Sequence, residues 1–141
     1  MPLPAPSTDD RLVDRLTGEL ELLTPAAIAA RFPDEPGRLR ADGEYHYRPP
    51  GGETFGDIAV RLSSFLDDLH REQTGRRVIV VAHDAVVLMI RAVIESLSMA
   101  EVAATVADGG PVRNASVTRF VATADRLVLA EYNTVGHLAE T

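Results

Sequence analysis

A histidine closes the most apolar run of the sequence, and its position is suited to chemistry. His83 follows residues 77–82 (RVIVVA), whose β-branched composition predicts a strand buried on both faces of a parallel sheet. Asp84 comes next and is expected to cap a helix over about residues 85–97. Ligands of open α/β sheets bind at the carboxyl ends of strands, and a helix N-terminus attracts anions. We therefore place His83 and Asp84 in a candidate site, while a histidine there can equally be a hydrogen-bonded structural residue.

A second group of reactive side chains precedes a capped helix. Tyr45, Tyr47 and Arg48 stand within a stretch rich in glycine and proline, and Glu53 closes that stretch. The guanidinium group of arginine binds anionic ligands, and the hydroxyl group of tyrosine binds anionic or hydroxylated ligands. A Gly-Gly turn with capping residues accounts for the end of the stretch but gives no reason for the tyrosines and the arginine. We therefore expect all four residues to line a small-molecule site.

A third group, Arg113, Asn114 and Ser116, stands at the entrance to a predicted hairpin. These residues can line the same site, although turn and capping roles are sufficient to explain them. Two of the other three histidines, at positions 70 and 137, are isolated and lack the spacing of metal ligands. The sequence predicts neither a metal nor a cofactor.

The elements that position these residues alternate between helices and strands. Thr24-Pro25 begins a short helix, and 32–52 is predicted to be a functional loop because of its prolines and glycines. Thr54 caps an amphipathic helix whose apolar side chains recur at helical spacing: Phe55, Ile58, Leu62, Phe65, Leu66 and Leu69. A further helix is expected over 99–106. A hairpin with strands at 116–122 and 127–132 follows, so the order indicates the α/β class.

Length and composition describe one acidic domain. The 141 residues carry a formal charge of −7 and no cysteine, which excludes disulfides and argues against nucleic-acid binding. We expect an irregular arm over 1–10 and a single domain over 11–141. The sequence has neither an apolar run long enough to cross a membrane nor the features of a secretory signal, so a cytoplasmic location without membrane contact is expected.

Three stretches together resemble a known family. They are PGGET at 50–54 with Asp57 and Arg61, VIVVAH at 78–83, and NASVT at 114–118. Their order resembles the histidine phosphatase superfamily, which has the phosphoglycerate mutase-like fold, and 45–53 is most similar to the fructose-2,6-bisphosphatase branch. The resemblance runs from Arg11 to His137. It implies a three-layer α/β/α sandwich with a mainly parallel sheet, here without the family's first strand.

The resemblance implies phosphoryl transfer through a phosphohistidine, with His83 holding the phosphoryl group and Asp14 in the place of a glutamate proton donor. Several residues depart from that pattern. The sequence has no Arg-His-Gly, the motif of the nucleophile, and Asp14 is one methylene shorter than glutamate. Asp84 puts negative charge where a phosphoryl group would bind, and Leu88 replaces an arginine of the bisphosphatase branch. These departures argue against phosphohistidine catalysis by this chain alone.

Three interpretations remain open. The chain can be a protein with a remodelled pocket for a small anionic or hydroxylated ligand, using His83, Asp14 and Asp84 in acid–base chemistry. It can be a phosphomonoester phosphatase or mutase completed by a partner chain or a further segment. It can also be a non-catalytic oligomerisation or regulatory module. Because an unpaired apolar strand would leave a bare sheet edge, a homodimer covering that edge is expected.

Overall fold

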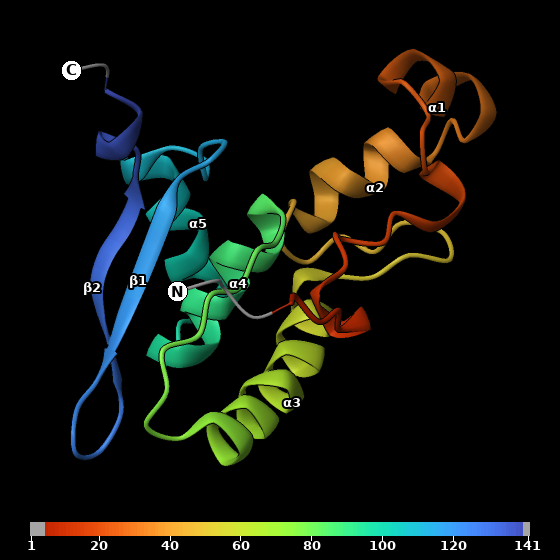
Figure 1. Ribbon diagram of the computed structural model, residues 1–141. Helices are drawn as coiled ribbons and strands as arrows, with labels where there is room; N and C mark the ends of the chain where they lie inside the picture. The colour runs from red at the N-terminus through yellow and green to blue at the C-terminus, as the bar shows by residue number, and fades with distance from the viewer. Residues whose placement is uncertain (1–4, 140–141) are drawn as a thin grey trace.

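The computed structural model describes residues 5–139, which form five α-helices and one two-stranded antiparallel sheet (Figure 1). The helices are α1 (Pro25–Arg31), α2 (Glu35–Asp42), α3 (Phe55–Gln73), α4 (Asp84–Glu95) and α5 (Met99–Gly109). The strands are β1 (Val117–Ala122) and β2 (Leu127–Thr134), and three short 3-10 helices are η1 (Asp10–Leu12), η2 (Gly18–Leu20) and η3 (Gly136–Leu138). The α/β class predicted from the element order is confirmed at this level.

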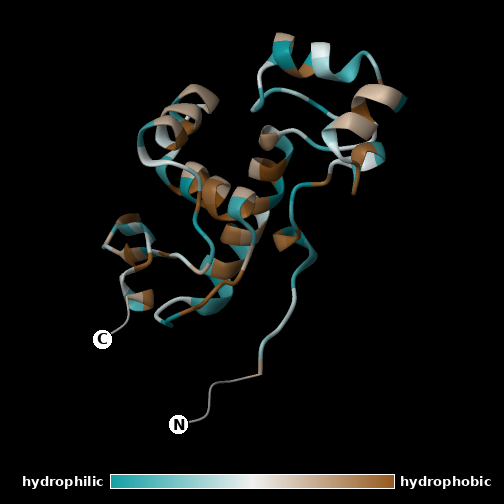
Figure 2. Cartoon of the chain, turned by 90° about the horizontal axis from the view of Figure 1, so that it is seen from above, coloured by the Kyte–Doolittle hydropathy of each residue, from teal (hydrophilic) through white to brown (hydrophobic). Residues whose placement is uncertain are grey.

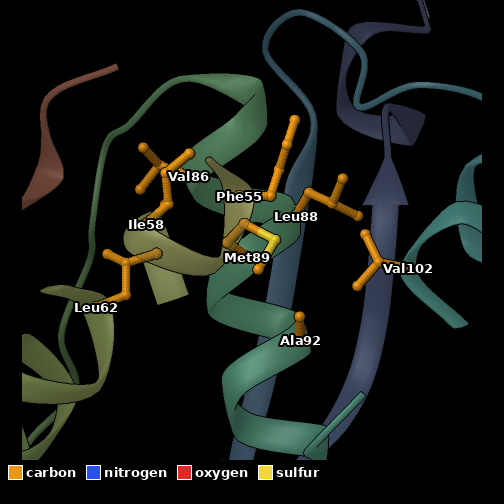
Figure 3. Packing of buried hydrophobic residues seen from close by; sticks show 8 residues of the cluster. All are labelled: Phe55, Ile58, Leu62, Val86, Leu88, Met89, Ala92 and Val102. Atoms are coloured by element: carbon orange, nitrogen blue, oxygen red, sulfur yellow. The ribbon is translucent and has the colours of Figure 1, made fainter. Parts of the chain in front are cut away.

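Helices α3 and α4 pack together and supply most of the core. The predicted apolar stripe of α3 is confirmed at Phe55, Ile58, Leu62 and Phe65, all of which are buried. Figure 3 shows Ile58 and Leu62 facing Val86 and Met89 of α4, while Val102 approaches from α5. The brown, hydrophobic residues in Figure 2 accordingly gather on the helices in the middle of the molecule.

The local signals that begin these helices act as expected. The Thr54 side chain accepts a hydrogen bond from the Asp57 amide, and the Asp57 carboxylate accepts one from the Thr54 amide, which forms a capping box. Ser98 and Glu101 form the same arrangement at the start of α5. The hairpin is also confirmed, with Thr123 donating its backbone N–H to the Arg126 carbonyl across the turn at 2.8 Å.

The prediction of a buried strand over 77–82 is wrong. Within residues 5–139 this segment belongs to no sheet, and the side chains of Ile79 and Val81 are 81% and 89% exposed. A strand needs a neighbour for its backbone N–H and C=O groups, and the sheet of the described residues is only the β1–β2 hairpin. The run therefore keeps its strand-like sequence but lies open between α3 and α4.

The loop expected over 32–52 also needs correction, because it contains α2. The one proline of α2, Pro36, stands in the first turn, where a helix tolerates it. Gly43 ends the helix with φ of 76°. Together α1 and α2 extend away from the α3–α4 core in Figure 1. Neither helix has a buried apolar side chain, and Glu35 is their one buried residue.

None of the helices in residues 5–139 combines the length and apolar character needed to cross a bilayer.

Candidate functional site

The structure brings Asp14 and His83 together, although they are far apart in the sequence. Nδ1 of His83 lies 3.5 Å from Oδ2 of Asp14, and both side chains are more than half exposed. His83 ends the open 77–82 segment, and Asp14 follows the η1 turn. An imidazole and a carboxylate at this separation form an ion pair when the imidazole is protonated, and both side chains remain accessible to a ligand.

His83, rather than Asp84, is the N-cap of α4, which corrects the predicted cap. The backbone of His83 is extended, with φ −81° and ψ 166°, and its carbonyl accepts the Val87 amide at 2.9 Å. Asp84 is the first residue of the helix, and its Oδ1 accepts the Ala85 amide at 2.8 Å. The helix starts one residue early because the His83 carbonyl already makes the first helical bond. The Asp14 carboxylate thus faces the His83 imidazole, while the Asp84 carboxylate bonds to the first turn of α4.

A close crossing of two backbone segments holds Asp14 in place. The Glu19 amide donates to the Pro50 carbonyl at 2.8 Å, and the Glu53 amide donates to the Leu16 carbonyl at 2.9 Å. Gly18 has φ of +60°, and a Cβ there would overlap the Pro50 carbonyl oxygen. The crossing therefore requires glycine and fixes the loop that carries Asp14 against the loop that carries Glu53.

Glu53 makes an ion pair with Arg61 inside this crossing. Oε1 of Glu53 lies 2.7 Å from Nη2 of Arg61, and only 13% and 17% of the two side chains are exposed. Oε1 also accepts the Leu16 amide at 3.1 Å. Arg61 donates further to the carbonyls of Arg11 and Asp14. Glu53 thus contributes to the site through the backbone that positions Asp14.

The two predicted tyrosines make contacts inside the protein. The Tyr47 hydroxyl donates to Oε2 of buried Glu35 at 2.6 Å, while burial and this bond raise the pKa of Tyr47 to about 12. The bond from Tyr47, together with Arg38, lowers the pKa of Glu35. The Tyr45 ring packs on Phe55 with 4.9 Å between ring centroids. The phenols therefore stabilise the loop, and the structure shows them bonded or packed rather than directed at His83.

Arg48 is also engaged, in an exposed ion pair with the Asp57 carboxylate at 2.7 Å. It donates in addition to the Gly52 carbonyl at 3.2 Å. Asp57 is the capping-box residue of α3, so Arg48 connects the loop before the helix to its first turn. Among the described contacts, no hydrogen bond or ion pair joins Arg48 to Asp14 or His83.

The third predicted group lies at the hairpin and is organised by Asn133. The Arg113 amide and guanidinium donate to the side chain and the carbonyl of Asn133, at 2.7 and 2.8 Å. Ser116 donates its amide to the Arg113 carbonyl at 3.1 Å, and Asn114 lies exposed in the turn between them. Within residues 5–139 these three residues have no hydrogen bond to the Asp14–His83 pair.

Two arginines with a positioning role were not identified as site residues from the sequence. The Arg61 side chain lies against Glu53 and is mostly shielded from solvent. Arg15 donates to the carbonyls of Tyr47 and Glu53 at 3.0 and 3.2 Å, and its guanidinium lies 4.7 Å from the centroid of the Phe55 ring. For Arg61 the available signal was its place beside PGGET and Asp57 in the stretch that carries the family resemblance.

The site as described offers proton transfer and hydrogen bonding. Residues 5–139 contain no cluster of three or more histidine or acidic side chains able to hold a metal ion. The imidazole of His83, the carboxylate of Asp14 and the first turn of α4, which begins at Asp84, are the groups available to a ligand.

Comparisons with known proteins show which family this chain resembles. Residues 4–135 match the family model of the histidine phosphatase superfamily (branch 1). A 6-phosphofructo-2-kinase/fructose-2,6-bisphosphatase of Caenorhabditis elegans is 37% identical over 75 residues, which are 53% of this chain and 16% of that protein.

Two solved structures are similar throughout most of the chain. The mycobacterial glucosyl-3-phosphoglycerate phosphatase in complex with inorganic phosphate is 27% identical with a TM-score of 0.70, covering 89% of this chain and 63% of that one. The same phosphatase with VO3 is 28% identical with a TM-score of 0.71, covering 90% and 62%. This chain therefore spans less than two thirds of those phosphatases. Because the family model matches nearly the whole of this chain, the chain belongs to the histidine phosphatase superfamily.

Proposed function

We propose that this protein binds a small hydroxylated or weakly anionic ligand at the Asp14–His83 pair and works without a phosphohistidine of its own. The observation that carries the proposal is the 3.5 Å separation of His83 Nδ1 and Asp14 Oδ2 on two exposed side chains. The absence of Arg-His-Gly from the 141 residues supports it, because the family resemblance associates the nucleophile with that motif.

The pair is arranged for general acid–base chemistry. A neutral His83 that directs an Nδ1 proton at Asp14 keeps a lone pair on Nε2. Nε2 then takes a proton from a ligand hydroxyl and returns it later in the reaction. The Asp14 carboxylate orients the ring and stabilises the imidazolium that forms, as carboxylates do beside catalytic histidines.

The charges around His83 favour a ligand with little negative charge. Asp14 lies next to the imidazole and Asp84 follows His83 in the chain, and carboxylates oppose a phosphoryl group. The nearby arginines already have partners: Arg61 binds Glu53, and Arg48 binds Asp57. A polyol or a monocarboxylate therefore fits these groups better than a bisphosphorylated sugar.

A second candidate is a phosphomonoester phosphatase completed by another polypeptide segment. Its support is that this chain spans 63% and 62% of mycobacterial phosphatases whose structures contain phosphate and VO3. In that case the added segment would supply the nucleophile and pair with 77–82, and the three-layer sandwich with a mainly parallel sheet would form around it.

Nuclear magnetic resonance titration separates the two candidates. Inorganic phosphate, vanadate and glycerol would each be added while the backbone amides of His83 and Ala85 are observed, in the wild type and in His83→Gln and Asp14→Asn. His70→Gln is the matched control, because His70 is an exposed histidine on α3. Hydrolysis of p-nitrophenyl phosphate would be measured on the same samples.

The proposal expects saturable shifts with glycerol that both site variants lose and His70→Gln keeps. Tighter binding of vanadate together with His83-dependent hydrolysis would support the second candidate instead. Failure of every compound to produce a saturable shift would contradict both and would leave the chain a non-catalytic module.

A further inference from the structure

The segment 77–82 is an apolar run with free backbone groups on the surface of the protein. Ile79 is 81% exposed and Val81 is 89% exposed, while Val78 and Val80 are 45% and 36% exposed. Within residues 5–139, no hydrogen bond uses the backbone N–H or C=O groups of this segment. Ala82, at its end, packs against the α3–α4 core and anchors the run there.

Such a segment has the properties of an unpaired edge strand. Four consecutive β-branched residues favour extended backbone, and exposed N–H and C=O groups pair readily with another strand. Neither proline nor glycine interrupts the run, and its one charged residue, Arg77, lies at its first position. Proteins rarely leave an edge of this kind uncovered.

We propose that a second copy of this chain covers the segment, by antiparallel pairing of 77–82 with itself about a two-fold axis. The argument for a second copy is charge complementarity. Arg76 and Arg77 precede the apolar residues. At the other end His83, which contacts Asp14, and Asp84 follow them. Antiparallel pairing brings the basic end of each copy against the acidic end of the other, twice in every dimer.

The two-fold axis and the charges together fix the register. A symmetric antiparallel pair places one residue opposite itself, and centring the pair on Val80 sets Arg76 opposite Asp84 of the second copy. In the same register Ile79 faces Val81 of the other copy, so the two most exposed side chains of the run meet across the axis. Val78 then faces Ala82 of the other copy.

This arrangement has a consequence for the candidate site. Arg77 of one copy lies opposite His83 of the other, where its guanidinium would face the carboxylate of Asp14. Each site would gain a cation from the neighbouring chain that its own chain does not provide. This consequence rests on the proposed function, whereas the pairing itself does not.

The dimer can be tested by cross-linking, because the chain contains no cysteine. Val80→Cys places a thiol opposite its own copy on the axis, where antiparallel neighbours come close enough for a disulfide. Val60→Cys is the matched control, an exposed valine on α3. Under mild oxidation, Val80→Cys is expected to form covalent dimers about tenfold faster than Val60→Cys, which reflects effective concentration at a formed contact.

Sedimentation equilibrium of the unmodified full chain supplies the independent measurement, and the mass of two chains is expected at micromolar concentration. Arg76→Asp should weaken the dimer by at least about tenfold because the change acts twice across the axis, and Arg76→Asp with Asp84→Arg should restore it. A one-chain mass at this concentration, or equal cross-linking of the two cysteine variants, would overturn the proposal. If no ligand produces a saturable shift at His83 while the dimer is observed, the proposed function is contradicted and the dimer is not.

Discussion

Glu53 and Arg61 form a shielded ion pair, 2.7 Å between Oε1 and Nη2, that connects the start of α3 to the loop carrying Asp14. Arg61 also donates to the Asp14 carbonyl at 3.3 Å, so one guanidinium fixes both the carboxylate of Glu53 and the backbone of Asp14. The position of the proposed acid–base pair therefore depends on a residue that touches neither reacting side chain.

Arg61→Lys tests this positioning role. Lysine keeps the charge but cannot reproduce the several N–H groups that Arg61 directs at Glu53 and at two carbonyls. We expect the free energy of unfolding to fall by about 2–3 kcal/mol, measured by urea denaturation. Arg119→Lys is the matched control, because Arg119 pairs with Glu131 on the exposed hairpin, and its effect should stay below about 1 kcal/mol. Equal losses in the two variants would contradict the assignment.

Gly18→Ala tests the crossing of the two loops. The added methyl group would collide with the backbone at Pro50, and the positive φ of 60° disfavours any side chain. We expect a loss of about 3 kcal/mol or more in unfolding free energy. Gly75 also has positive φ, but nothing lies within 4 Å of its Cβ position. Gly75→Ala should therefore cost only about 1 kcal/mol, and a similar loss at both positions would mean that the crossing is not tight.

Tyr47 predicts an alkaline transition. Its pKa is raised from 10.0 in an ordinary tyrosine to about 12, chiefly by burial and then by the bond to Glu35. Because the folded value lies above the unfolded one, this phenol contributes stability at pH below 10 that is lost as the pH rises toward 12. Absorbance at 295 nm should show a tyrosinate step near pH 12 that Tyr47→Phe removes and His46→Gln retains. Ionisation of Tyr47 near pH 10 in the folded protein would contradict the burial of its hydroxyl and its bond to Glu35.

The tautomer of His83 gives a direct test of the orienting role proposed for Asp14. With the carboxylate 3.5 Å from Nδ1, the neutral ring is expected to carry its proton on Nδ1. Long-range proton–nitrogen correlation spectra, recorded where the ring is neutral, should show this form, and Asp14→Asn should shift the population toward the Nε2-protonated form. Finding the Nε2-protonated form in the wild type would remove Asp14 from the proposed mechanism.

The sequence was sufficient to predict the elements that local chemistry determines. Thr54 and Ser98 cap α3 and α5 because their side chains bond to the first turn, and the apolar spacing of α3 predicts the face that is buried. The hairpin was predicted from two strand-like runs joined by a turn at 123–125. The proximity of Asp14 and His83 was implied by the family resemblance, and the 3.5 Å separation agrees with it.

Most of the predictions that failed concern contacts between residues far apart in the chain. The run at 77–82 was expected to be a buried strand, but burial depends on a neighbouring strand that a periodic pattern cannot supply. The internal partners of Tyr47, Arg61 and Arg113 could not be predicted, since each lies far along the chain from the group it contacts: Glu35, the Asp14 backbone and Asn133. Helix α2 was missed because Pro36 and Gly37 lie in its first turn and Gly43 follows its last residue, so that these residues suggested a loop.

The sparse attachment of α1 and α2 has an evolutionary consequence. Their contribution to the interior is a single carboxylate, held by Tyr47 and Arg38, while the α3–α4 core folds without an apolar side chain from either helix. Such a unit can open or lengthen at little cost to global stability. Insertions and substitutions can accumulate in these helices faster than in the core, so related proteins can diversify this region while the scaffold beneath it stays constant.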